Sequence, residues 1–145
     1  MPNIRWLLAL ITRVQRWLYL KTDGAIGANI FGIGMLLLTN VGRRSGHPRI
    51  TPLLYIDDGD HWVVAASNAG DARNPAWWLN LQANPHARIQ IRREHHDVVA
   101  RRATPEEEER LWPVLTSSYR YYRDYRNKTD REIPIVILER AAPAA

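Results

Sequence analysis

The residues best suited to chemistry begin with the segment Gly42-Arg43-Arg44-Ser45-Gly46, which is followed by Arg49. Two glycines allow the backbone to curl, so that successive N–H groups converge on an anion. Two adjacent guanidinium groups and a hydroxyl would strengthen such a site, because arginine binds phosphate and carboxylate through paired hydrogen bonds. The segment lacks the spacing of glycines and lysine that defines a P-loop. The sequence of this segment supports an anion-binding loop and a plain basic hairpin turn equally.

Two further segments could contact a flat ligand. In Ala65-Ala66-Ser67-Asn68-Ala69-Gly70, small side chains would let a ring approach the backbone, and Ser67 can donate a hydrogen bond. Taken alone, this segment is more typical of an ordinary loop. In Asn74-Pro75-Ala76-Trp77-Trp78-Leu79-Asn80, a helix start offers N–H groups to an anion and tryptophan offers an aromatic wall. The alternative is a short helix packed on the barrel by its tryptophans.

Three tyrosines form the fourth candidate. Tyr119, Tyr122 and Tyr125 lie three residues apart and would share one face of a helix. They could form a phenolic lid over an active site. Leu111 and Leu115 continue the same stripe, so packing in the core is a strong alternative.

Composition limits the class of protein. The chain has 145 residues, which suits one domain, and no cysteine, which excludes disulfides, thiolate metal sites and cysteine nucleophiles. Residues 1–56 hold seven basic side chains against one acidic side chain, whereas the rest of the chain is nearly balanced. This asymmetry predicts an anionic partner for the N-terminal third. No histidine spacing indicates a metal site, and the basic residues form separate patches, which argues against nucleic acid.

Hydrophobic periodicity predicts about six strands, mostly linked as hairpins, with peripheral helices. The strands are expected at 35–41, 49–56, 61–66, 86–92, 95–102 and 133–138. One short helix is expected over 75–81, with Asn74 as N-cap and Pro75 as first helical residue. A longer helix starts at a capping box formed by Thr104 and Glu107 and runs towards Tyr125, with a kink at Pro113. The pattern is typical of a small barrel, since most linkers are too short for parallel crossovers.

Residues 1–21 form an amphipathic N-terminal helix in this interpretation, and residues 22–145 form the single barrel domain. The apolar side of the helix carries Leu10, Val14 and Trp17, and the polar side carries Arg13 and Arg16. Its apolar runs are too short to span a bilayer. The helix either packs on the barrel or a partner subunit, or lies in a membrane surface with its arginines on anionic lipid.

Taken together, these motifs resemble the deazaflavin-dependent nitroreductase family of F420H2-dependent reductases. The resemblance is carried by LLLTNVGRRSGHPRITPLLYIDDGDHWVVAASNAGDARNPAWWLNLQANPHARIQI, with YLKTDGAIGANIFG before it and YRYYRDYRNKTDREIPIVILE after it. It implies a mainly β split barrel of the flavin-reductase type, related to pyridoxamine-phosphate oxidases. It also implies coenzyme F420, a reduced 8-hydroxy-5-deazaflavin with a phosphate and an oligoglutamate tail, as hydride donor.

The resemblance also implies roles for the four segments. The anionic tail is expected to bind the turn at 42–46 and its neighbours, and the deazaflavin ring is expected to lie against the small-residue segment at 65–70. The ribityl-phosphate region is expected to contact the short helix at 75–81. The acceptor is expected near Ser67 and the three tyrosines. The expected coenzyme-binding residues are Gly42, Arg43, Arg44, Ser45, Gly46, Arg49, Pro52, Ala65, Ala66, Ser67, Asn68, Pro75, Ala76, Trp77, Trp78, Asn80 and Tyr122. The expected catalytic residues are Ser67, Tyr119, Tyr122 and Tyr125.

The implied reaction is hydride transfer from reduced F420 to a quinone or nitroaromatic acceptor, in the cytoplasm or at the inner face of the membrane, by a chain that forms a homodimer. Many relatives have lysine at the positions of Arg44 and Asn68, so Arg44 keeps a charge that Asn68 loses. Two alternatives stay open. One is an FMN-binding split-barrel reductase, and the other is a non-catalytic carrier of the deazaflavin or of a lipid.

Overall fold

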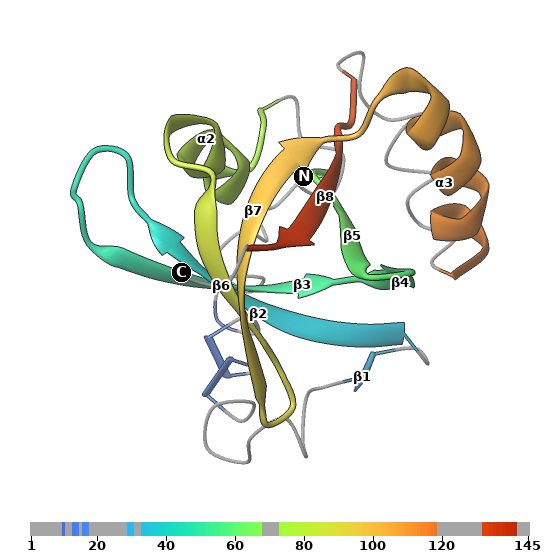
Figure 1. Cartoon of the computed structure of the whole chain (residues 1–145). Coiled ribbons are helices and arrows are strands. Elements are labelled where there is room, and N and C mark those ends of the chain that lie inside the picture. The colour runs from blue at the N-terminus through green and yellow to red at the C-terminus, as the bar shows by residue number, and fades with distance from the viewer. Residues whose placement is uncertain are drawn as a thin grey trace, which may run out of the picture.

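The computed structural model describes residues 10, 13, 14, 16, 17, 29–30, 33–67, 73–118 and 132–141. Antiparallel strands dominate this part of the chain, and two helices accompany them (Figure 1). The strands are β1 (Asn29–Ile30), β2 (Ile33–Val41), β3 (Pro48–Leu54), β4 (Ile56–Asp58), β5 (His61–Ala65), β6 (His86–Ile91), β7 (Glu94–Arg102) and β8 (Ile135–Arg140). The helices are α2 (Ala76–Ala83) and α3 (Pro105–Ser118).

The sheet curls because its two edges are consecutive in the chain. The strand order is β1-β2-β6-β7-β8-β5-β4, with β3 paired to β2. β3 ends at Leu54 and β4 begins at Ile56, so the chain passes from one edge of the sheet to the other at Tyr55. The Tyr55 backbone N–H donates to the Gly34 carbonyl at 3.1 Å. A Cβ on Gly34 would lie 2.8 Å from the Tyr55 ring, so a larger residue at this corner would displace that ring.

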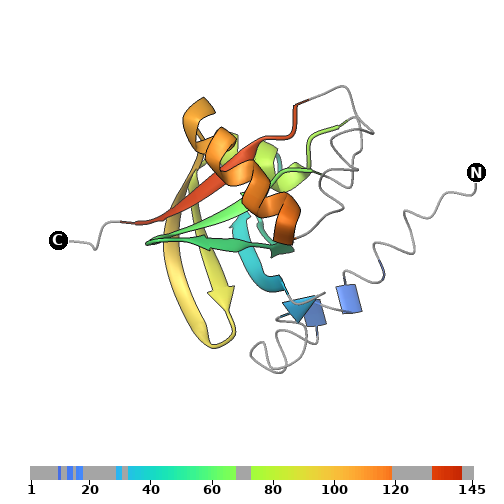
Figure 2. The ribbon, with the colours of Figure 1, turned by 90° about the vertical axis from the view of Figure 1, so that its right-hand side faces the viewer.

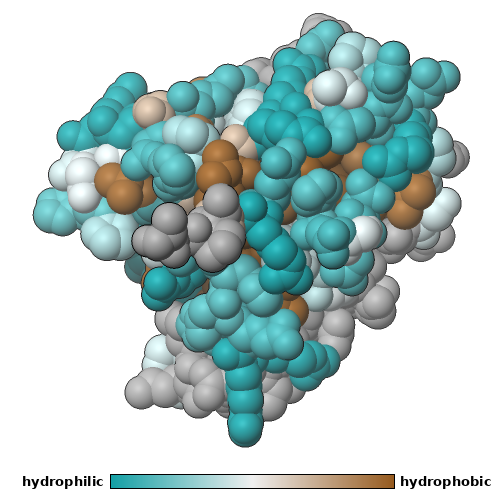
Figure 3. Space-filling model, viewed as in Figure 1, coloured by the Kyte–Doolittle hydropathy of each residue, from teal (hydrophilic) through white to brown (hydrophobic). Residues whose placement is uncertain are grey.

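The interior of the barrel is built from alternate residues of the strands, as the period of two requires. Leu36 and Leu38 of β2 pack with Val64 of β5 and Ile89 of β6. The tryptophans and Leu81 of α2 join the same cluster, so α2 closes one end of the barrel (Figure 1). Figure 3 shows hydrophilic residues over most of the face seen in Figure 1, which leaves the apolar side chains mainly inside.

The opposite face of β5 and β8 supports α3, which crosses these strands in Figure 2. Leu111 and Leu115 pack against Val63, Ile135 and Ile137. These two leucines therefore belong to a core.

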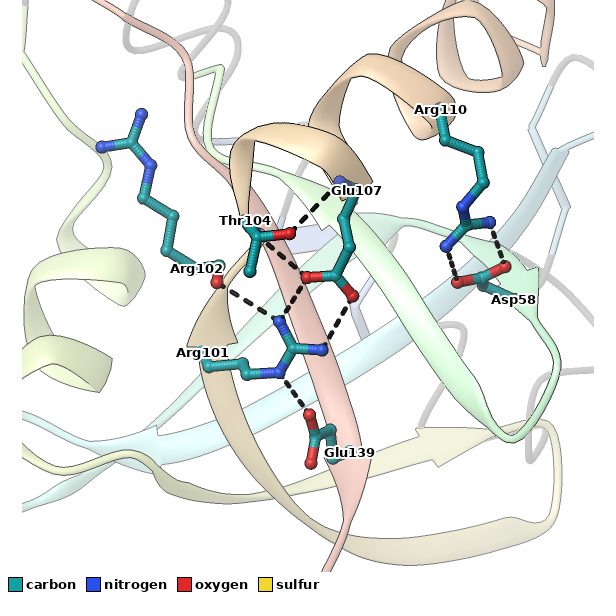
Figure 4. A network of polar contacts seen from close by, with 7 residues as sticks. All are labelled: Asp58, Arg101, Arg102, Thr104, Glu107, Arg110 and Glu139. Carbon is teal, nitrogen blue, oxygen red and sulfur yellow. Dashed lines mark hydrogen bonds and ion pairs between the residues drawn. The ribbon is translucent and has the colours of Figure 1, made fainter.

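Ion pairs fix both the start and the outer side of α3 (Figure 4). Glu107 accepts two hydrogen bonds from the Arg101 guanidinium, at 2.6 and 2.8 Å, and Arg101 also donates to Glu139. The predicted capping box is present: the Thr104 N–H donates to Glu107 at 2.9 Å, and the Glu107 N–H donates to the Thr104 hydroxyl at 3.2 Å. Arg110 of α3 binds Asp58 of β4 through two bonds, at 2.9 and 3.0 Å.

The predicted architecture is confirmed, but the number of strands, several strand bounds and the start of α2 are wrong. Two short strands, β1 and β4, raise the number of described strands above the expected six, because Tyr55 interrupts the second predicted strand and Asn29–Ile30 pairs with β2. Helix α2 begins at Ala76, and Pro75 is its N-cap instead of Asn74. No side chain caps the helix, and the Pro75 carbonyl accepts its first backbone hydrogen bonds, from the Trp78 and Leu79 N–H groups.

We expect Glu107→Gln to lower the free energy of unfolding by about 1–2 kcal/mol at pH 7, because the bidentate ion pair is lost from a partly exposed position. The Arg101 guanidinium, and after it the Thr104 N–H, lowers the pKa of Glu107 from 4.5 to about 2. The ionised carboxylate therefore stabilises the fold fully above pH ~4.5 and less as the pH falls towards 2. Urea unfolding from pH 7 to pH 2 measures this difference.

Glu106→Gln is the matched control, because Glu106 lies in the same first turn of α3 and is exposed. Equal losses of stability in the two variants, or a difference that does not depend on pH, would show that the ion pair contributes nothing.

Candidate functional site

The turn between β2 and β3 has a fixed, tightly bonded shape. The Gly42 N–H donates to the His47 carbonyl at 2.9 Å, and the Gly46 N–H donates to the Gly42 carbonyl at 2.8 Å. Gly46 has φ +72°, a conformation that other residues rarely adopt. A Cβ on Gly42 would lie 2.8 Å from the Ser45 hydroxyl oxygen, so a larger residue there would displace that hydroxyl. That hydroxyl accepts the His47 N–H at 3.2 Å, and its own proton is left to donate.

Helix α2 holds this turn in place through two asparagines. Asn80 Oδ1 accepts from both the backbone N–H and the guanidinium of Arg43, at 3.1 and 2.9 Å. Asn40, at the end of β2, donates through Nδ2 to the Trp77 carbonyl at 3.1 Å. Both asparagines are buried: Asn40 is 3% exposed and Asn80 is 5% exposed. The position of the Arg43 side chain is therefore set before any ligand binds.

A cavity of about 710 Å³ lies between this turn, β3 and α2. Its lining includes four arginines and no carboxylate among the described residues. The lining residues are Arg16, Gly42, Arg43, Arg44, Ser45, Pro48, Arg49, Ile50, Thr51, Ala76, Trp77 and Asn80. The volume is in the range of sites that enclose a small molecule or a large part of a cofactor.

The cavity is suited to an anion with several charges. Its arginines bring at least four positive charges to one space, and in the described ranges none of them is paired with a carboxylate. The first N–H groups of a helix have no acceptor within that helix, and Ala76 and Trp77, the first residues of α2, line the cavity. Phosphate and carboxylate groups match both kinds of donor. A phosphate with a polycarboxylate tail therefore fits the residues that are present.

Eight of the predicted coenzyme-binding residues converge on this cavity. They come from two segments that are distant in sequence, the β2–β3 turn and α2. They are Gly42, Arg43, Arg44, Ser45, Arg49, Ala76, Trp77 and Asn80. These positions favour an anion-binding loop over a plain basic hairpin turn. The arginines of the turn line one cavity and are not spread along a hairpin.

Other predicted site residues do not line this cavity. They are Gly46, Pro52, Ala65, Ala66, Ser67, Pro75 and Trp78. Ala65, Ala66 and Ser67 follow one another at the end of β5 with exposures of 6%, 0% and 8%. Ala66 and Trp78 belong to the barrel core, so Trp78 has a packing role. Asn68, Tyr119, Tyr122 and Tyr125 lie outside the described residues.

Four lining residues were not predicted: Arg16, Pro48, Ile50 and Thr51. The last three flank Arg49 on β3, and only the fold shows that this strand forms a wall. Arg16 comes from the N-terminal segment, whose described residues are helical, and its Nη1 donates to the Ile50 carbonyl at 3.3 Å. No spacing in the sequence connects Arg16 with a turn that begins at Gly42.

Comparison with known proteins identifies the family. Residues 11–140 match the family model described as F420H(2)-dependent quinone reductase. The chain is 36% identical over 134 residues to F420H(2)-dependent quinone reductase Rv1261c of Mycobacterium tuberculosis, and the match covers 90% of each chain.

Solved structures agree with this match. The fold is similar to an F420-H2 dependent reductase, FDR-A, with a TM-score of 0.67 and 35% identity over 72% of this chain and 93% of that one. A chain solved as a domain-swapped dimer gives a TM-score of 0.70 and 31% identity over 93% and 98% of the two chains. A candidate pyridoxamine 5′-phosphate oxidase from Listeria innocua, 12% identical with a TM-score of 0.53 over 74% and 84%, shares the split-barrel fold alone. The chain belongs to the F420H(2)-dependent quinone reductase family.

Proposed function

We propose that the arginine cavity holds the phosphate and oligoglutamate tail of coenzyme F420 while this chain reduces a quinone. The observation that carries the proposal is the set of four arginines around one cavity with no carboxylate among its described lining residues. When bound, the reduced coenzyme supplies a hydride, so the protein has to bind and orient and does not have to activate a nucleophile.

Each part of the cavity has a distinct task in this proposal. Arg43, fixed by Asn80, gives a guanidinium in a set position, which reduces the entropy that is lost when the tail binds. Arg44 of the turn and Arg49 of β3 supply further charge. Trp77 gives an apolar wall between the anionic tail and the barrel. The tail therefore acts as an anchor that sets the position of the ring.

The hydride acceptor would lie beyond this anchor, towards the end of β5. Ser67, which follows that strand and is 8% exposed, is our candidate for a hydroxyl that orients the acceptor or stabilises charge on its oxygen. Tyr119, Tyr122 and Tyr125 are our candidates for the acceptor pocket and for proton delivery. We extend the proposal from quinones to nitroaromatic compounds, because both are electron-poor acceptors of a hydride.

Mixing the purified chain with reduced F420 and menadione should oxidise the coenzyme, which absorbance of the oxidised form measures directly. A nitroaromatic compound should replace menadione in the same assay. Boiled protein and reactions without acceptor are the controls.

Three results would contradict this account. Absence of F420 binding would exclude it outright. Co-purification of a yellow flavin that F420 does not displace would favour an FMN enzyme. Tight F420 binding without oxidation by any quinone or nitroaromatic compound would favour a carrier.

We expect Arg43→Ala and Arg44→Ala each to weaken F420 binding by about 1–3 kcal/mol, because each removes charged hydrogen bonds to the tail. Fluorescence titration with F420 measures the affinity. Arg93→Ala is the control, because Arg93 is an exposed arginine in the β6–β7 turn, outside the cavity. If all three variants bind F420 as the unmodified chain does, the tail does not occupy the cavity.

We also propose that the N-terminal segment contacts a membrane surface, from which a quinone could be supplied. Leu10, Val14 and Trp17 lie at helical spacing and are 51%, 51% and 57% exposed, so their apolar stripe does not pack on this barrel. Arg13 is exposed beside them and can meet anionic head groups. Among the described residues, no helix is long and apolar enough to cross a bilayer.

Flotation with vesicles that contain anionic lipid should recover the chain, and Trp17→Ser should reduce the recovered fraction several-fold, since the largest apolar group of the stripe is lost. Val114→Ser is the matched control, because Val114 is 46% exposed on α3. Equal recovery of both variants would contradict membrane contact through this stripe.

The same apolar stripe could instead pack against a partner subunit. Because a similar chain is solved as a domain-swapped dimer, we propose that this chain forms a homodimer. In that case Trp17→Ser would shift the protein towards the monomer in light scattering and leave vesicle binding unchanged.

A further inference from the structure

We infer that Arg16 is a further binding residue for the anionic tail of the coenzyme, supplied to the cavity by the N-terminal helix. The inference rests on the proposed function of the arginine cavity. It adds a residue that lies 26 positions before the turn and that no feature of the turn predicts.

The placement of Arg16 differs from that of its neighbours on the helix. Arg13, Val14 and Trp17 are exposed, whereas Arg16 is half-buried and lines the cavity. The helix is thus turned so that one guanidinium, and not the apolar stripe, faces the barrel. The membrane alternative for this helix places Arg16 beside Arg13 on anionic lipid, whereas the contact of Arg16 with β3 gives it a different role.

Among the described residues, the contact that holds Arg16 is weak and can be exchanged. Its Nη1 donates to the neutral Ile50 carbonyl at 3.3 Å, beyond the usual length of a charge-assisted bond. A guanidinium carries five N–H donors, and this bond uses one of them. A phosphate or carboxylate in the cavity is a stronger acceptor than a carbonyl, so a bound tail would draw Arg16 inwards.

The charge balance supports the same conclusion. Arg16 meets Arg43, Arg44 and Arg49 around one space, and no described carboxylate compensates them. Bringing a fourth like charge to that space is unfavourable unless an anion is bound there. A purely structural link to Ile50 would need only a neutral donor. An arginine at this position is therefore better suited to an anionic ligand than to the link with Ile50 alone.

The test compares Arg16→Gln with Arg13→Gln, which removes the same charge from an exposed position on the same helix. We measure binding of F420 and of 8-hydroxy-5-deazariboflavin, which lacks the phosphate and the glutamates.

Arg16→Gln should weaken F420 binding by about 5- to 20-fold. It should leave binding of the tail-less compound within about twofold and the melting temperature within about 2 °C. Arg16→Lys, which keeps the charge, should recover part of the affinity.

Arg43→Gln serves as the reference for the cavity itself. If Arg43→Gln weakens F420 binding while Arg16→Gln matches Arg13→Gln, the role of Arg16 is overturned and the proposed function stands. If neither Arg43→Gln nor Arg16→Gln changes F420 binding, the cavity does not hold the tail and both proposals fail. Equal loss of affinity for F420 and for the tail-less compound would assign Arg16 a structural role.

Discussion

Repulsion between the arginines of one cavity is the constraint on which the rest of this site depends. Two arginines near α3 are neutralised by carboxylates: Arg101 by Glu107 and Glu139, and Arg110 by Asp58. Around the cavity, Arg16, Arg43, Arg44 and Arg49 have no such partner among the described residues. Two of these guanidinium groups are held by neutral acceptors, Arg43 by Asn80 and Arg16 by the Ile50 carbonyl, which preserves their attraction for an anion.

The fold maintains this arrangement from three directions. The glycines at positions 42 and 46 fix the turn, and Asn80 fixes Arg43 upon it. The tryptophans of α2 anchor that helix in the barrel core, so Asn80 cannot move away from the turn. The ion pairs of α3 lie on the opposite face of β5 and β8 and stabilise the sheet without entering the cavity.

The local features of this protein could be predicted from its sequence, and the long-range ones could not. The capping box at Thr104 and the alternation in β6 depend on residues close in the chain, and both are present. The strand break at Tyr55 depends on contact with Gly34, which no local pattern reveals. In the same way, Arg43 was identified from its turn, whereas Arg16 reaches the cavity only because the N-terminal helix docks beside β3. The resemblance to a family implies the coenzyme, and the arginine cavity, which only the fold reveals, is where we propose that its anionic part binds.

The most direct test of the central claim is a crystal structure of the chain with coenzyme F420 bound. We predict that the phosphate and the first glutamates lie between the β2–β3 turn and α2, with Arg43 and Arg16 within hydrogen-bond distance of their oxygens. A complex in which the tail lies outside this cavity, with the arginines facing solvent, would contradict the account.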